Sequence, residues 1–191
     1  MNKAISLDAA IIVTGVSKRT LWRRVTSGQI TRQGSDARGR AMLTWADLIP
    51  MLCISVDPDD YPLFLDADAG NADAQNDLAT IFLEADRPDI ALQWLQMAVE
   101  QGHADAMHNL AMLHFEGVGV PRNETVGVMW LAKAASHGHP IGSQQVAALL
   151  SLPRQRTADS GQRTADSGQR TADSKARTRH LPGQENSVPR T

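Results

Sequence analysis

The spacing of hydrophobic residues predicts a chain built mainly from short helices. Residues 6–14 begin with a capping serine and continue in helix-compatible residues as far as a glycine. In residues 18–26 the apolar positions recur at helical spacing, and they are Leu21, Trp22 and Val25. The other positions of this segment are mainly cationic. It therefore predicts a helix with one buried edge and one cationic edge, preceded by Ser17 as its N-cap.

Two short strands are predicted next, around a glycine-rich turn. Residues 29–33 and 40–44 supply the strands, and residues 34–39 supply the turn. Thr44 then caps a closing helix from Trp45 to about Cys53, in which Pro50 predicts a kink or an early end. The small core expected for this part of the chain consists of Leu21, Trp22, Val25, Ile30, Leu43, Trp45 and Leu48.

The segment Gly15 to Arg24 has the sequence Gly-Val-Ser-Lys-Arg-Thr-Leu-Trp-Arg-Arg, and a basic hairpin and a Thr-Trp-x-Asp-Leu helix follow it. This order, over about residues 5–53, resembles the winged helix-turn-helix of MerR and excisionase proteins. In that family the second helix enters the major groove of DNA, and the hairpin, or wing, touches the backbone or the minor groove. The resemblance implies the following DNA-binding residues: Ser17, Lys18, Arg19, Thr20, Arg23 and Arg24 on the helix, and Arg32, Arg38 and Arg40 on the wing.

Charge is distributed unevenly along the chain. Residues 1–53 carry 8 Lys and Arg against 3 Asp and Glu, a net charge of +5, whereas residues 54–153 carry −11 and residues 154–191 carry +4. Clustered cations bind DNA phosphates by releasing counterions, so the N-terminal charge agrees with a DNA-binding module. The alternative is that this charge is only a solvated face. The family usually dimerises through a long helix after the module, but residues 54–61 here form an acidic linker without heptads.

A repeat follows the linker. The segments at residues 70–74, 102–106 and 138–142 each begin with glycine, at spacings of 32 and 36 residues. Trp94-Leu95 and Trp130-Leu131 occupy equivalent places before the next glycine. Each unit is therefore predicted to be a pair of helices that ends at a glycine C-cap. The expected core residues are Leu78, Phe82, Trp94, Leu95, Leu110, Leu113, Phe115, Trp130 and Leu131.

The unit from Ala104 to Gly138 is similar to the Sel-one-like repeat, a relative of the tetratricopeptide repeat. It holds Ala-x-Ala-x3-Leu-Ala, then His-x-x-Gly-x-Gly-Val, then Trp-Leu-x-Lys-Ala-Ala-x-x-Gly. The resemblance implies a helical solenoid over residues 62–153 that presents a surface to a protein partner. Because this surface is acidic, a basic partner is expected. Two full units are near the lower limit for a stable solenoid, so self-association into a homo-oligomer is also possible.

The remaining chemistry is sparse. Residues 154–191 repeat Arg-Thr-Ala-Asp-Ser-Gly-Gln and contain few large apolar side chains, which predicts a disordered tail. The single cysteine, Cys53, excludes an internal disulfide framework. No arrangement typical of catalysis, metal binding or cofactor binding is present, so the chain is predicted not to be an enzyme. No membrane-spanning or secretory segment is expected either, which favours a cytoplasmic location.

The sequence thus predicts a mainly α fold with a small winged helix-turn-helix domain (1–53), an acidic linker (54–61), a solenoid of α-helical hairpins (62–153) and a disordered tail (154–191). The leading hypothesis is a regulatory protein that binds double-stranded DNA and whose repeats bind a protein partner. Two alternatives remain open at this point. One is an interaction adaptor without DNA binding, since a fold does not fix a function. The other is an excisionase-like protein that bends DNA.

Overall fold

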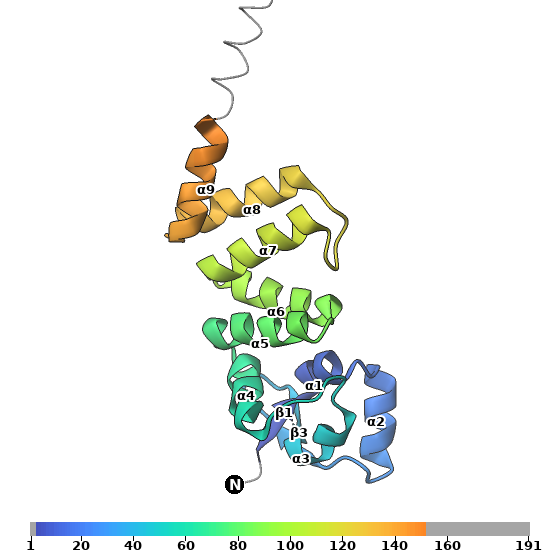
Figure 1. Ribbon diagram of the computed structural model, residues 1–191. Helices are drawn as coiled ribbons and strands as arrows, with labels where there is room; N and C mark the ends of the chain where they lie inside the picture. Colours follow the sequence, from blue (N-terminus) through green and yellow to red (C-terminus); the bar gives the residue numbers. More distant parts are fainter. Residues whose placement is uncertain (1–2, 152–191) are drawn as a thin grey trace, which may run out of the picture. The chain divides into compact units, whose positions relative to one another are not determined.

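The N-terminal part of the chain folds into three helices and a small antiparallel sheet, and the described residues after it are mainly helical (Figure 1). The computed structural model describes residues 3–151, so the tail predicted for residues 154–191 lies outside the described residues. The N-terminal elements are β1 (Ala4–Ser6), α1 (Leu7–Thr14), α2 (Lys18–Thr26), β2 (Arg32–Ser35), β3 (Ala41–Thr44) and α3 (Trp45–Leu48). The chain forms one compact unit up to Val146.

Helices α1 and α2 lie where the sequence predicts them, and their ends have identifiable causes. The hydroxyl of Ser6 accepts a hydrogen bond from the backbone N–H of Ala9, which caps α1. Gly15 ends α1 in the left-handed conformation, with φ 66°. A residue with a side chain would be strained in this conformation. Ser17 caps α2 in the same way as Ser6 caps α1, through the backbone N–H of Thr20. A tight turn between two capped helices results.

The sheet differs from the prediction in its extent. Its strand order is β1-β3-β2, and the edge strand β1 (Ala4–Ser6) was not predicted. It pairs antiparallel with β3, with Ile5 opposite Leu43. The first hairpin strand is shifted from the expected 29–33 to Arg32–Ser35, and it extends into the predicted turn. Its late start follows from the end of α2, where the backbone N–H groups of Gln29 and Ile30 bond to the Arg24 carbonyl. The second strand begins at Ala41, one residue later than expected. The hairpin itself, β2 with β3, is present.

The closing helix is shorter than predicted. Helix α3 ends at Leu48, and a 3-10 turn, Ile49–Met51, follows it and contains Pro50. Proline lacks the N–H that the α-helical ladder needs, so the early end has the expected cause. Thr44 occupies the N-cap position but makes no capping bond, since its hydroxyl accepts from the Gln33 side-chain amide instead. Of the expected core, Trp22 and Val25 are only half-buried, and the other members are buried.

The helices of the repeat region follow a second 3-10 turn, Pro58–Asp60. They are α4 (Tyr61–Ala69), α5 (Ala72–Glu84), α6 (Pro88–Glu100), α7 (Ala104–Glu116), α8 (Glu124–Ser136) and α9 (Pro140–Ser151). Helix α5 packs against α6, and α7 packs against α8, as neighbouring pairs (Figure 1). The expected core residues of this region are buried except for Phe115 and Trp130, which are half-buried.

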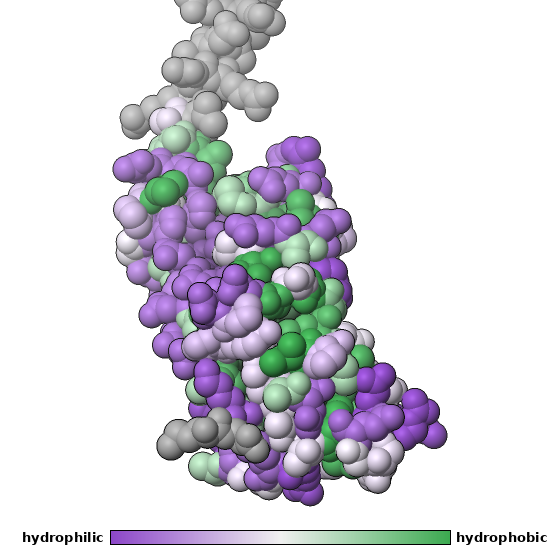
Figure 2. Space-filling model, turned by 60° about the horizontal axis from the view of Figure 1, so that its bottom comes forward, coloured by the Kyte–Doolittle hydropathy of each residue, from purple (hydrophilic) through white to green (hydrophobic). Residues whose placement is uncertain are grey.

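The N-terminal part and the repeat region share one hydrophobic core. The Trp45 ring lies 5.6 Å from the Tyr61 ring and 5.2 Å from the Phe64 ring, between centroids. The Phe64 ring in turn lies 6.2 Å from the Phe82 ring in α5. These contacts run from α3 through α4 into the first helical pair, and Tyr61, the last residue of the predicted linker, is part of them. On the face drawn in Figure 2, hydrophilic residues cover most of the surface and hydrophobic residues gather near its middle.

A buried carboxylate joins the two parts. Asp68, near the end of α4, accepts hydrogen bonds from the backbone N–H of Ser6 at 2.7 Å and from the Ser6 hydroxyl. It also forms an ion pair with Arg40 at 2.7 Å, and the Asp68 side chain retains only 5% of its exposure. The same guanidinium binds Asp36 at 2.7 Å. Asp68 thus connects the edge strand, the cap of α1 and the hairpin to α4.

Replacement of Asp68 by alanine should destabilise the protein. The substitution leaves the Ser6 N–H without its buried acceptor and removes one of the two carboxylates that bind the Arg40 guanidinium. Because Arg40 keeps 24% of its exposure, we expect a loss of about 3 kcal/mol, the low end for breaking a buried pair. The measurement is the free energy of unfolding in urea. The control is Asp66→Ala in the same helix, where an exposed carboxylate is removed and a change within about 0.5 kcal/mol is expected. Equal effects of the two variants would contradict this role.

The repeats begin with equivalent caps, of which two are histidines. Asn71 caps α5 through its side-chain oxygen, and His103 and His139 cap α7 and α9 through Nδ1. The Nε2 atom of each histidine faces an aspartate in the first turn of the preceding unit, with His103 2.9 Å from Asp73 and His139 3.4 Å from Asp105. An Nδ1 atom that accepts a hydrogen bond carries no proton, so both caps require the neutral imidazole.

The cap at His139 predicts a pH dependence of stability. Burial lowers the pKa of His139, the His108 ring stacked on it at 4.3 Å lowers it further, and Asp105 only partly opposes this. The unfolded chain therefore binds a proton more readily than the folded chain. This contribution to stability is present above the ordinary histidine pKa of about 6.5 and is lost as the pH falls below it.

The variant His139→Asn tests this, because asparagine can cap a helix without titrating, as Asn71 does in α5. We expect the wild type to lose more unfolding free energy than the variant between about pH 7.5 and pH 5.5. Urea titrations at each pH measure the difference. Parallel pH profiles for the two proteins would show that the His139 cap does not titrate with folding.

Candidate nucleic-acid interface

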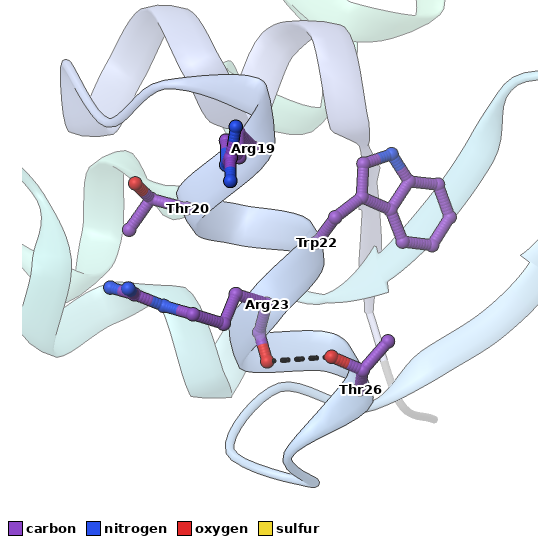
Figure 3. A pocket seen from close by; sticks show the side chains of 5 residues that line it. All are labelled: Arg19, Thr20, Trp22, Arg23 and Thr26. Carbon is purple, nitrogen blue, oxygen red and sulfur yellow. Dashed lines mark hydrogen bonds between the residues drawn. The ribbon is translucent and has the colours of Figure 1, made fainter.

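Helix α2 carries most of the predicted DNA-binding residues on its outer side. Arg19 and Arg23 are four residues apart and thus lie on one face of the helix, and both are exposed. With Thr20, Trp22 and Thr26 they line an open hollow of about 390 Å³ (Figure 3). The Trp22 ring projects to the opposite side of the helix from Arg23 in this view. The hollow is thus lined by cationic side chains and by an aromatic ring that come from different sides of the helix.

A second hollow lies between α2 and the hairpin. It has a volume of about 370 Å³, and Lys18 and Trp22 line it from α2 while Arg32 and Arg38 line it from the hairpin. The guanidinium of Arg32 lies 5.7 Å from the centre of the Trp22 ring, a cation–π distance. Arg40 and the carboxylate of Asp8 line this hollow too, so Lys18 of α2 and all three hairpin arginines meet at it. Trp22, which the sequence places in the core, belongs to both hollows.

Three of the predicted residues in α2 and at its N-cap have contacts within the protein. Ser17 supports the helix as its cap, and its hydroxyl also contacts the Thr20 hydroxyl at 3.1 Å. Arg24 is half-buried and its Nη1 lies 2.7 Å from the Met51 sulfur, so it packs against the 3-10 turn after α3. These contacts hold the helix in place and leave Lys18, Arg19 and Arg23 as the outward-facing cations of α2.

Arg40 also has a structural role that the sequence does not predict. Its guanidinium is held by Asp36 and Asp68, both at 2.7 Å. Burial lowers the pKa of Arg40, but the hydrogen bonds and charges of the two carboxylates outweigh it and raise the pKa overall. For the carboxyl group of Asp36, burial acts in the other direction and raises the pKa. The hydrogen bonds and the charge of Arg40 outweigh this effect, so the pKa of Asp36 lies below its ordinary value. Arg40 therefore fixes the hairpin to α4, and its contact with DNA stays a prediction. The prediction missed this because Asp68 is far away in the sequence.

The described residues offer little for other chemistry. Within residues 3–151, no group of three or more histidine, cysteine, aspartate or glutamate side chains could hold a metal ion. Cys53 is half-buried with its thiol near the Val13 carbonyl, and burial raises the pKa of this thiol although Arg87 partly opposes the effect. In the same part of the chain, no helix is long and apolar enough to cross a bilayer.

Comparison with known proteins concerns the repeat region. The family model described as "Sel1 repeat" matches residues 72–103 and 104–139. Each match covers one helical pair, α5 with α6 and α7 with α8, and the capping residues between them. Residues 72–139 belong to the Sel1 repeat family. Sel1 repeats imply protein–protein interaction, and proteins built from them are typically non-enzymatic scaffolds or adaptors.

Two solved structures are similar to the chain. The crystal structure of a Sel1 repeat protein from Oxalobacter formigenes is 33% identical, with 46% of this chain and 69% of that chain covered and a TM-score of 0.43. The crystal structure of c5321, a protective antigen of uropathogenic Escherichia coli strains with an SLR fold, is 29% identical, with a TM-score of 0.44. That match covers 50% of this chain and 21% of c5321. No curated protein matches the chain.

Proposed function

We propose that the chain is a regulatory protein that binds double-stranded DNA through α2 and the hairpin and binds a protein partner through its Sel1 repeats. The observation that carries the DNA-binding part is the set of outward-facing cations around Trp22. These are Lys18, Arg19, Arg23, Arg32 and Arg38. This function requires that the chain meet duplex DNA, which agrees with the cytoplasmic location that the sequence predicts.

The fold of the N-terminal part supports this use of α2. The turn between α1 and α2 is fixed by Gly15 and Ser17, so α2 has a defined direction relative to the rest of the molecule. Its outer face has no described protein side chain packed over Arg19 or Arg23. A helix presented in this way fits the DNA major groove, where an arginine can bind guanine through two hydrogen bonds. The hairpin cations would then lie next to the phosphate backbone.

Net charge favours the same orientation. The repeat region is strongly acidic, so DNA is repelled from it and attracted to the N-terminal part. The acidic surface suits a partner with cationic groups. We propose such a partner for the repeats, while the alternative of an adaptor without DNA binding keeps only this second interaction.

DNA binding is tested by the salt dependence of affinity for a random duplex, measured by fluorescence anisotropy on the full chain. Each neutralised phosphate contributes a slope of roughly −0.9 to the plot of log affinity against log salt. The double variant Arg19→Ala, Arg23→Ala should therefore reduce the magnitude of the slope by about 1.8 and weaken binding at low salt.

The matched control is Arg122→Ala, which removes an exposed arginine from the repeat region and leaves α2 intact. Its slope should equal that of the wild type. A flat salt dependence in the wild type would contradict DNA binding and favour the adaptor. A wild-type slope that the double variant retains would show that DNA binds elsewhere. Circular-permutation mobility shifts then separate a DNA-bending protein from one that leaves the duplex straight.

A further inference from the structure

A small cavity lies where the N-terminal part meets the repeats. It has a volume of about 110 Å³ and is bounded by α1, the hairpin, the end of α4, and the first repeat pair, α5 and α6. Its walls are mainly apolar, and Ala9 and Ile12 line it from one side while Ala67, Trp94 and Met97 line it from the other. An engineered apolar cavity of about 150 Å³ binds benzene, so this cavity has room for a smaller organic molecule.

Three of the polar groups around the cavity already have partners. Arg40 and Asp68 are bound to each other, as described above. Gln75 is buried, donates from Nε2 to the Ala67 carbonyl at 3.0 Å and accepts from the Gln101 side chain at 2.7 Å. These groups form a fixed polar boundary and need no ligand.

The buried Nε1 of Trp94, which lines the cavity, has no hydrogen-bond partner among the described residues. Arg38 is a second exception. Its backbone N–H binds Asp36, but within the described residues its guanidinium takes part in no hydrogen bond or ion pair. The guanidinium lies beside Gly70 at the end of α4, with Nη2 3.5 Å from the position that a Cβ atom on this glycine would take. Gly70 therefore leaves space at the cavity for an arginine side chain that is available to an anion.

We propose that this cavity binds a small monocarboxylate with a short, branched or compact apolar body. The carboxylate would pair with the Arg38 guanidinium, which can donate two parallel hydrogen bonds to it. The apolar body would lie against Ile12, Trp94 and Met97. Asp8 also lines the cavity, so a second negative charge on the ligand is disfavoured. For a ligand of this size the dissociation constant should be on the order of 0.1–1 mM.

A bound carboxylate would also affect the proposed DNA interface. Arg38 lines both this cavity and the hollow next to Lys18 and Trp22. A carboxylate that engages Arg38 removes one cation from the DNA side, and binding of the ligand and of DNA should therefore oppose each other. This regulatory step rests on the proposed DNA-binding function, whereas the cavity itself does not.

The experiment titrates the full chain with isobutyrate and follows tryptophan fluorescence and the thermal midpoint. Trp94 lines the cavity, so a saturable fluorescence change and an increase in the midpoint are expected. Arg38→Gln should weaken binding at least tenfold, and Met97→Phe, which fills the cavity, should also weaken it. Arg32→Gln is the matched control, since it removes a hairpin arginine that does not line this cavity. Isobutyramide, which lacks the charge, should bind much more weakly.

The outcomes separate the two proposals. No saturable binding of isobutyrate, equal binding by the Arg38→Gln variant, or equal binding of isobutyramide would overturn the carboxylate site. Anisotropy with duplex DNA is measured in parallel, and isobutyrate should weaken DNA binding by the wild type but not by Arg38→Gln. If isobutyrate binds and DNA does not bind at all, the cavity site stands and the proposed function fails. If both bind without opposition, only the coupling through Arg38 is wrong.

Discussion

The buried carboxylate of Asp68 holds the arrangement of the molecule together. Three donors converge on it, from the backbone and hydroxyl of Ser6 and from Arg40. The Ser6 hydroxyl also caps α1, so the start of that helix depends on the same carboxylate. A buried negative charge is tolerated only when it is paired and hydrogen-bonded, and here each requirement is met by a different element of the N-terminal part. The position of the hairpin is thereby fixed to the first helix of the repeat region.

Because of this arrangement, the three arginines of the hairpin have different roles. Arg40 is neutralised by Asp36 and Asp68 and adds no free charge to the surface. Arg32 packs on Trp22 beside α2, and Arg38 extends toward the end of α4. The three residues lie within nine positions of the sequence, yet one serves structure, one faces the cationic helix, and one lies between the two parts. The resemblance to a winged helix-turn-helix assigns all three to the wing.

Local signals in the sequence predict the helices well. Ser6, Gly15 and Ser17 act through their immediate neighbours, so the ends of α1 and α2 follow from the residues themselves. The repeats are equally visible, since the recurring glycines and small residues of residues 72–139 match the Sel1 family model. The short strand β1 has no comparable signal, because three residues supply too little pattern and its ladder depends on a partner near residue 43.

Long-range partners explain what the sequence does not predict at the candidate site. The pairing of Arg40 with Asp68, and of Trp45 with Tyr61 and Phe64, joins segments that were assigned to a module, a linker and a solenoid. An acidic stretch with proline is typical of a linker, but Tyr61 and Phe64 pack their rings on Trp45. A fragment that ends at residue 53 would therefore lose both rings and the Asp68 carboxylate. The cationic helix packs on that shared core, so its DNA binding should be measured on the full chain. The repeats can then affect DNA binding by supporting the position of this helix, without contact between their acidic surface and DNA.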